Sequence, residues 1–232
     1  MRPTPALTLA GAVVLALTAL TAGVLHPGWV RSLDWQVHLW VEAHLRDELV
    51  QVIFTVAAWP GQRGVVLVPL LAVALLAARR RRSARPLLVT VGMLAGVAFS
   101  VWLFKVGVGR VAPGAGRDAV HAGGLSYPSG HAVNALVCWA LVLEFVASLG
   151  HRVARVLSVR RRRTITALLA LATGTGMTAL DYHWLSDTIA GWLIGVLILG
   201  GVLTIDPVGP GRTSANLRPS VPQSPGRPAP SG

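Results

Sequence analysis

Two short segments of the sequence each place proton-handling side chains directly before a long apolar run. The first segment, Tyr127–His131, reads Tyr-Pro-Ser-Gly-His, and the second, His183–Asp187, reads His-Trp-Leu-Ser-Asp. Histidine is a poor lipid-facing residue, and its pKa near neutrality suits it to give or take a proton. We therefore expect the two segments to meet and form a site for phosphate transfer.

The first segment has the features of an anion-binding helix start. Unpaired backbone N–H groups and the positive end of the helix dipole attract anions at such a position. Gly130 would let a phosphate approach the backbone, Ser129 would add a hydroxyl donor, and His131 can protonate a leaving oxygen. The alternative is that Ser129 only caps the helix and that His131 is an interfacial residue.

The second segment pairs a histidine with a carboxylate. His183 and Asp187 are four residues apart, so they share one face of a helical turn. A carboxylate bonded to one imidazole nitrogen fixes the tautomer and leaves the other nitrogen free to attack phosphorus. The alternative is that Asp187 and Ser186 only cap the helix that follows. We interpret Trp184 as an ordinary residue of the membrane aromatic belt.

Two basic residues precede the first segment. Lys105 lies near the end of an apolar run, where a lone lysine would extend its ammonium group to the lipid headgroups. Because Arg110 and the Ser129–His131 segment follow on the same side, we expect Lys105 to bind phosphate instead. The loop residues Asp118 and His121 are expected to be solvated, and the alternative is that they contact the substrate.

The composition indicates a polytopic membrane protein. Of 232 residues, 53% are hydrophobic and 13% are charged, and the apolar runs are long enough to span a bilayer. The net charge of +12 would also suit a nucleic-acid-binding protein. However, most arginines lie in short runs beside apolar segments without a nucleic-acid-binding motif, so we expect the partners to be the lipid bilayer and no nucleic acid.

The apolar runs predict an all-α bundle of six transmembrane helices in a single domain, residues 1–205. A tryptophan-rich segment, His26–Glu48, is predicted to lie in the membrane interface as an amphipathic helix with solvated charged faces. Residues 206–232 are rich in Pro, Gly and Ser and are predicted to form a disordered cytoplasmic tail. The predicted spans are Ala6–Leu25, Gly64–Ala78, Leu87–Val108, Ala132–Leu149, Thr164–Leu180 and Thr188–Ile205.

The distribution of arginine predicts the orientation in the cell membrane. Six spans place both termini, the run Arg79–Arg82 and the basic stretch Arg152–Arg163 on one side. Because loops rich in Lys and Arg stay in the cytoplasm, both termini are predicted to be cytoplasmic. The two histidine segments then lie at the external face.

Lys105, the Pro-Ser-Gly-His of Pro128–His131 and the His-x-x-x-Asp of His183–Asp187 resemble the three signature motifs of the type 2 phosphatidic acid phosphatase family. This family is the membrane branch of a superfamily that also contains vanadium haloperoxidases, and the resemblance covers residues 105–195. It implies a metal-independent, cofactor-free phosphatase that acts on a phosphatidate-like lipid or a polyprenyl diphosphate through a phosphohistidine. It further implies that His183 is the nucleophile, Asp187 its orienting partner and His131 the general acid, with Lys105, Ser129 and Gly130 holding the phosphate oxygens.

Two arginines of the family motifs are absent from the sequence. Ala112 and Met177 occupy their positions. Arg110, two residues before Ala112, is our candidate substitute as a phosphate ligand, and nothing basic lies near Met177. The pattern therefore also fits a catalytically weak or inactive family member that binds lipid or a partner protein. A small transporter is poorly supported, because the polar residues gather at one face of the membrane.

Overall fold

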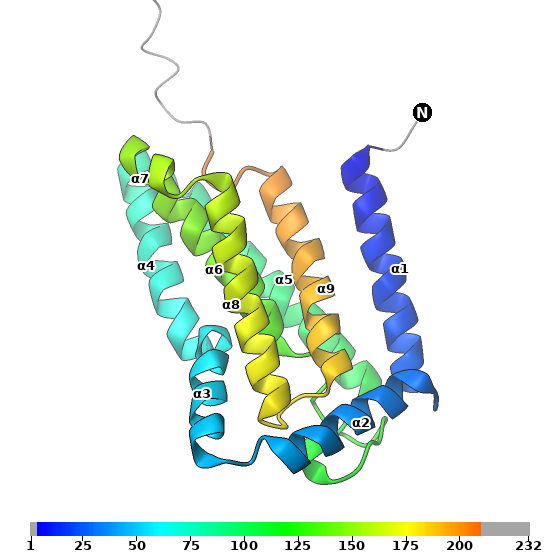
Figure 1. The fold of residues 1–232 in the computed structure, drawn as a ribbon. Helices are drawn as coiled ribbons and strands as arrows, with labels where there is room; N and C mark the ends of the chain where they lie inside the picture. Colours follow the sequence, from blue (N-terminus) through cyan, green and yellow to red (C-terminus); the bar gives the residue numbers. More distant parts are fainter. Residues whose placement is uncertain (1–3, 210–232) are drawn as a thin grey trace, which may run out of the picture.

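The computed structural model describes residues 4–209, and within this range every regular element is helical (Figure 1). This confirms the predicted all-α class. Of the predicted tail, residues 206–209 are described and follow the last helix, whereas residues 210–232 lie outside the described residues. The α-helices are α1 (Pro5–Leu25), α2 (Trp29–His44), α3 (Glu48–Ala58), α4 (Arg63–Arg81), α5 (Arg85–Val108), α6 (Gly130–Ser148), α7 (His151–Val156), α8 (Val159–Ala179) and α9 (Leu185–Thr204), with 3-10 turns η1 (Trp59–Gly61) and η2 (Pro113–Ala115).

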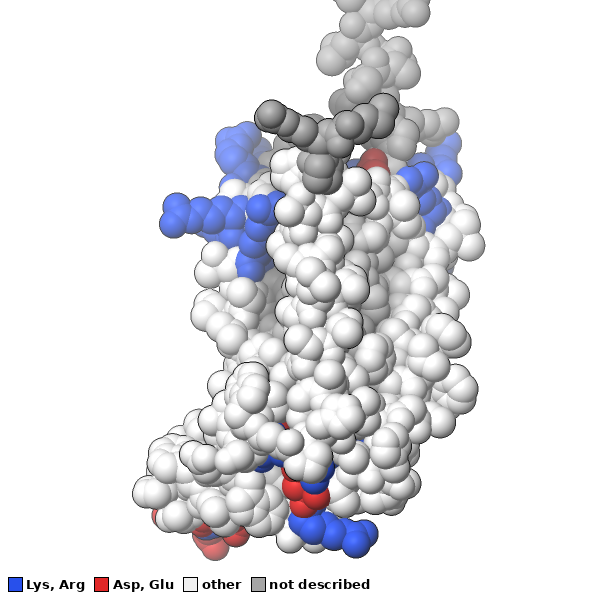
Figure 2. All heavy atoms as spheres, turned by 90° about the vertical axis from the view of Figure 1, so that its right-hand side faces the viewer, with Lys and Arg blue, Asp and Glu red and all other residues white. Residues whose placement is uncertain are grey.

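Within residues 4–209, five helical stretches are long and apolar enough to cross a membrane, which supports a multi-pass membrane protein. The face shown in Figure 2 agrees with this, because its charged side chains gather at the two ends of the molecule and leave an uncharged band between them. The five stretches are Pro5–Leu25, Glu48–Arg81, Arg85–Ala115, Gly130–Ser148 and Leu185–Thr204.

The predicted fifth span, Thr164–Leu180, lies in α8, which is not among the five stretches. Four consecutive arginines, Arg160–Arg163, occupy its first turns, and several threonines and glycines follow. These residues lower the mean hydropathy of the helix. In the fold, α8 nevertheless packs along its length against α6 and α3.

The 3-10 turn η1 joins α3 to α4 within one continuous apolar stretch. Gly61 is required at this joint. A Cβ atom there would lie 2.7 Å from the carbonyl oxygen of His131 and 2.4 Å from Cγ2 of Thr173. The start of α4 is therefore held directly against the start of α6.

Helix α2 crosses the lower end of the bundle in Figure 1 and buries one face against it. The buried positions Val30, Asp34, His38 and Val41 recur at helical spacing. The prediction that the charged faces of this segment are solvated is wrong for Asp34 and His38, which are 2% and 8% exposed. Both side chains have charged partners in the bundle, which offset the cost of their burial.

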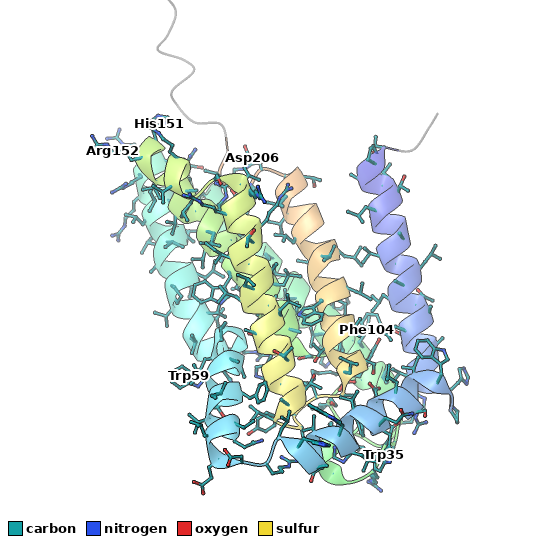
Figure 3. All side chains as sticks on the ribbon, in the orientation of Figure 1. Trp35, Trp59, Phe104, His151, Arg152 and Asp206 are labelled. Atoms are coloured by element: carbon teal, nitrogen blue, oxygen red, sulfur yellow. The ribbon has the colours of Figure 1, made fainter. Side chains whose placement is uncertain are left out.

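The long helices bring several chain segments together at the lower end of the bundle. There α5 ends, α6 and α9 begin, and the loop of residues 109–128 closes the space between them (Figure 1). The start of α1 and the end of α9 lie at the opposite end. Figure 3 shows His151, Arg152 and Asp206 at that upper end and Trp35 at the lower end.

Candidate active site

A pocket of about 510 Å³ opens at the lower end of the bundle. It contains both histidines of the two sequence segments. No Asp or Glu is among the described residues that line it, so its charge favours an anion. The lining residues are Gln62, Arg63, Gly64, Lys105, Ala112, Leu125, Ser126, Gly130, His131, Asn134, Tyr182 and His183.

The rings of His131 and His183 face each other across this pocket. Their centroids are 5.8 Å apart and their planes are inclined by 62°. His131 is in the first turn of α6, and His183 immediately precedes α9. The N–H of Ser129 donates to the carbonyl oxygen of Asp187 at 2.9 Å, which ties the two helix starts together. The structure thus brings together the two segments that lie more than fifty residues apart in the sequence.

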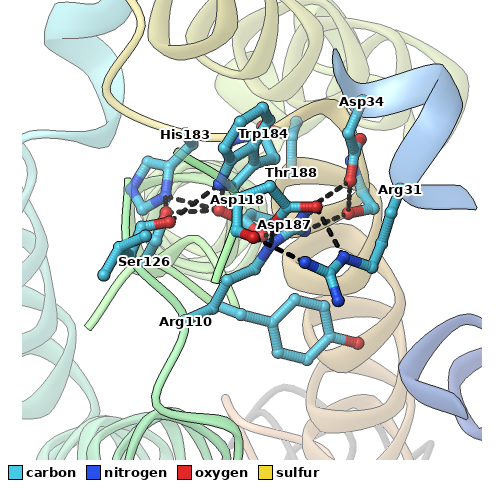
Figure 4. Close-up of polar contacts among 12 residues, drawn as sticks. Arg31, Asp34, Arg110, Asp118, Ser126, His183, Trp184, Asp187 and Thr188 are labelled. Atoms are coloured by element: carbon cyan, nitrogen blue, oxygen red, sulfur yellow. Dashed lines mark hydrogen bonds and ion pairs between the residues drawn. The ribbon is translucent and has the colours of Figure 1, made fainter. Parts of the chain in front are cut away.

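Asp187 contacts His183 and also caps α9. Its Oδ2 atom lies 3.5 Å from Nδ1 of His183 and accepts a hydrogen bond from the N–H of Trp184 at 3.1 Å. Ser126 donates its hydroxyl to the same oxygen and lies 3.4 Å from Nδ1 of His183 (Figure 4). With Nδ1 directed toward Asp187, Nε2 is the ring nitrogen left for chemistry.

Arg110 is fully buried and does not line the pocket. Its guanidinium group lies among three carboxylates, at 2.8 Å from Asp34, 3.0 Å from Asp118 and 3.1 Å from Asp187 (Figure 4). It also donates to Ser186 Oγ at 2.8 Å. The structure therefore places Arg110 behind Asp187, on the side of that carboxylate away from the pocket, and not beside the expected phosphate.

Two predictions around Arg110 are wrong. Asp118 was expected in a solvated loop, but it bridges Arg110 and Arg31, the latter at 2.6 Å. Trp184 was expected in the membrane aromatic belt, but it is 1% exposed. Its ring lies 4.8 Å from the Arg110 guanidinium carbon, and its indole N–H donates to the carbonyl oxygen of Val111 at 2.8 Å. The reason is the same in both cases: a buried guanidinium group needs anionic or aromatic partners, and Asp118 and Trp184 both contact Arg110.

Asp34 connects α2 to this network. Its carboxylate accepts hydrogen bonds from the backbone N–H of Ser186 at 2.9 Å and from the Ser186 hydroxyl at 2.5 Å, in addition to Arg110. Burial raises the pKa of Asp34, while the Arg110 charge and the Ser186 donors act against that rise. The helix that the sequence placed in the interface therefore holds the start of α9.

Of the other predicted phosphate-binding residues, Lys105 and Gly130 line the pocket and Ser129 does not. Lys105 lines the pocket and donates to the carbonyl oxygen of Leu125. Gly130 also lines the pocket, at the first position of α6. Ser129 is fully buried, is not among the lining residues, and accepts a hydrogen bond from the N–H of Ala132 at 3.3 Å. Ser129 is thus the N-cap of α6, which is the alternative that the sequence left open.

The region of the second missing arginine is packed tightly. Met177 is 2% exposed. Its carbonyl oxygen accepts hydrogen bonds from the N–H groups of Tyr182 and His183 at 3.1 and 3.2 Å. A Cβ atom on Gly176 would lie 2.7 Å from the carbonyl oxygen of Phe54, so α3 and α8 are in direct backbone contact here.

One group of potential metal ligands, His38, Glu42 and Asp181, is found in the described part of the chain, outside the pocket. Arg46 forms ion pairs with both Glu42 and Asp181, and His38 lies 3.0 Å from Asp181. The arginine already supplies positive charge to these carboxylates, so the group is a salt-bridge cluster. It also turns Asp181 away from the pocket, where its charge would oppose a phosphate.

Sequence reasoning missed five polar residues of the pocket, Gln62, Arg63, Ser126, Asn134 and Tyr182. Asn134 lies one helical turn after His131, a spacing that predicts a shared face. Ser126 lies in the loop, where its contact with Asp187 depends on the fold. Arg63 begins a helix some forty residues before Lys105, and the sequence offered no signal that it would reach the same pocket.

Comparison with known proteins agrees with this arrangement. The profile of the PAP2 superfamily matches residues 85–208, which is more than half of the chain, so the chain belongs to the PAP2 superfamily. A similar solved structure is the crystal structure of "the first transmembrane PAP2 type phosphatidylglycerolphosphate phosphatase from Bacillus subtilis". It matches with a TM-score of 0.69 and 20% identity, over 85% of this chain and 95% of that one. No curated protein matched the sequence.

Proposed function

We propose that this protein is an integral membrane phosphatase that hydrolyses the phosphomonoester or diphosphate headgroup of a lipid through a phosphohistidine on His183. The observation that carries the proposal is the pairing of His131 and His183 across one basic pocket that no acidic side chain lines. Membership of the PAP2 superfamily and the fold shared with a membrane phosphatase support the same class of reaction.

In the first step, Nε2 of His183 attacks phosphorus and the bond from phosphorus to the lipid oxygen breaks. His131 gives its proton to that leaving oxygen, so the lipid departs as a neutral alcohol, or as a lipid monophosphate from a diphosphate substrate. Asp187 fixes the tautomer of His183 and stabilises the positive charge that develops on its ring. Lys105 and the backbone N–H groups at Gly130 stabilise the phosphoryl oxygens.

In the second step, His131 accepts a proton from water, and the water oxygen attacks the phosphohistidine. The phosphorus–nitrogen bond breaks, inorganic phosphate leaves and His183 returns to its starting form. In this scheme Arg110 and Ser129 act as positioning residues. Arg110 holds Asp187 from behind, and Ser129 caps the helix that carries His131.

We propose further that the site faces the cell exterior, with α8 as a sixth span and both termini in the cytoplasm. The arginine-rich ends of α4 and α8 lie at the end of the bundle away from the pocket, which fits the positive-inside rule. The similar solved structure is a phosphatidylglycerolphosphate phosphatase, so we choose the lipid monoester phosphatidylglycerolphosphate as the first substrate to test.

The test is phosphate release from detergent micelles of phosphatidate, phosphatidylglycerolphosphate and a polyprenyl diphosphate by the purified protein. We expect His183→Ala to fall to background and His131→Ala to slow release by about 10²–10⁴-fold. His151→Ala, an exposed histidine at the other end of the bundle, is the matched control and should match the wild type. Equal release by the wild type and His183→Ala would overturn the proposal and favour a lipid-binding role.

A further inference from the structure

We infer that Arg63 is a phosphate-binding residue of this pocket and supplies the second positive charge beside Lys105. The inference rests on the proposed function and adds a residue outside the region that the family profile matches. Arg63 is the first residue of α4, and Lys105 is in the last turn of α5. They are the Arg and Lys residues that line the pocket with His131 and His183.

The position of Arg63 is fixed by the backbone and not by a flexible loop. Two residues earlier, Gly61 lies against the His131 carbonyl, so the start of α4 cannot move away from the start of α6 without losing this contact. Arg63, His131 and Lys105 line the same pocket. A phosphate between the two histidines would therefore lie within the field of the guanidinium group.

Arg63 also differs from three other arginines at this end of the bundle, Arg31, Arg46 and Arg110, because no carboxylate pairs with its side chain. The other three are each paired with carboxylates. Arg63 is exposed, and within residues 4–209 its side chain makes no hydrogen bond or ion pair. A guanidinium group that no protein anion neutralises, in a pocket that no acidic residue lines, is suited to bind an anion from outside. Its planar donors match two phosphate oxygens.

The start of α4 adds to this site. The N–H groups of Val65 and Val66 donate to the Gln62 carbonyl, whereas those of Arg63 and Gly64 have no partner among the described residues. Gly64 lines the pocket and has open space where a Cβ atom would be. A phosphate held by Arg63 would therefore also meet two free backbone donors at the positive end of a 19-residue helix.

Ala112 offers a way to test the charge itself. It lines the same pocket but contributes only a methyl group. If the pocket requires a second cation and does not depend on its attachment point, an arginine at position 112 should replace Arg63. A purely structural role of Arg63 at the start of α4 would not be rescued from this separate loop.

The experiment compares Arg63→Ala with the double variant Arg63→Ala/Ala112→Arg. For each, kcat/KM is measured on phosphatidylglycerolphosphate micelles, and inorganic phosphate binding is measured without turnover by ³¹P NMR titration. A hydrogen bond to a charged group predicts that Arg63→Ala lowers kcat/KM by about 10- to 150-fold and weakens phosphate binding. The double variant should recover at least part of both losses. The midpoint temperature of unfolding should be similar in all proteins.

Arg117→Ala is the matched control, because Arg117 is an exposed arginine at the same end that does not line the pocket. Its kcat/KM should stay within twofold of the wild type. If Arg63→Ala behaves like Arg117→Ala while His183→Ala abolishes release, the inference fails and the proposed function stands. If His183→Ala has no effect on release, the proposed function fails. In that case the inference about Arg63 is tested by inorganic phosphate binding alone. Phosphate binding by Arg63→Ala that equals wild-type binding would overturn the inference.

Discussion

Nη1 of Arg110 lies 3.1 Å from Oδ1 of Asp187, on the side of that carboxylate opposite to His183. The other carboxylate oxygen, Oδ2, is directed to His183 and Ser126. One buried ion pair thus fixes which oxygen of Asp187 meets the histidine. Because Arg110 also binds Asp34 of α2, the orientation of the proposed nucleophile depends on a helix that does not contribute a residue to the pocket.

The first prediction concerns Asp187→Asn. The amide keeps the shape of the side chain but cannot stabilise a positive imidazole, and it can favour the wrong tautomer of His183. We expect kcat to fall about 100-fold or more, with little change in KM. Ser126→Ala is the comparison, because it removes one neutral hydrogen bond to the same carboxylate and should lower kcat by about 10-fold or less. Equal effects of the two substitutions would argue against a charge role for Asp187.

The second prediction concerns Arg110→Met. Methionine fills much of the same volume but leaves three carboxylates, those of Asp34, Asp118 and Asp187, without their shared cation. Removing one partner from a buried ion pair typically costs about 3–5 kcal/mol. We therefore expect a clearly lower midpoint temperature of unfolding in detergent, together with lower kcat.

Arg117→Met is the control for this prediction, because Arg117 lies in the same loop and is exposed. It should change stability by no more than about 0.5 kcal/mol. The opposite outcome is an Arg110→Met protein that is as stable as the wild type but binds inorganic phosphate more weakly. That result would show that Arg110 is a phosphate ligand, as the sequence suggested.

The third prediction concerns the contact between α6 and α9. A Cβ atom on Gly191 would lie 2.6 Å from the carbonyl oxygen of Ser129 and 2.9 Å from Cβ of Ala132. Gly191→Ala must therefore push apart the two helix starts that carry His131 and Asp187. We expect a loss of about 1–3 kcal/mol in stability and a fall in kcat.

Gly200→Ala is the matched control, because Gly200 is in the same helix and has no atom within 4 Å of its would-be Cβ. Alanine there should leave kcat unchanged and stabilise the helix by up to about 1 kcal/mol. If both alanine variants keep wild-type kcat and stability, the close approach at Gly191 does not position the site.

The predictable part of the site was the part encoded in local patterns. His131 follows a helix cap and His183 precedes a carboxylate by one turn, so their spacing alone suggested their chemistry. Arg110 was predicted to bind phosphate, but it lies in a loop, and the sequence of a loop does not show where a side chain points. In the fold, the buried carboxylate of Asp34 supplies a partner from 76 residues away in the sequence. Partners separated in this way are set by packing, which a single sequence does not record.

In the fold, too, local sequence patterns predicted the helices, whereas contacts between distant segments were not predictable. Helix type and extent followed from the apolar runs, and α5 begins and ends within two residues of the prediction. The number of spans did not follow as simply, because α8 carries arginines and threonines and is not among the stretches of residues 4–209 that are apolar enough to span a membrane. Asp34 and His38 were assigned to solvent for a similar reason. Their partners come from α9, its preceding turn and the 109–128 loop, and no pattern within α2 indicates them.

The fourth prediction concerns orientation in the membrane. The chain has a single cysteine, Cys138, which is buried, so a cysteine introduced at an exposed position can be labelled selectively. Arg117 lies in the loop at the pocket end and Ser83 follows α4 at the opposite end, and both are exposed.

On intact cells, a membrane-impermeant maleimide should label Arg117→Cys, whereas Ser83→Cys should be labelled only after permeabilisation. Wild-type protein gives the background. Labelling of Ser83→Cys on intact cells, with Arg117→Cys protected, would place the pocket in the cytoplasm. The substrate headgroup would then have to come from the inner leaflet.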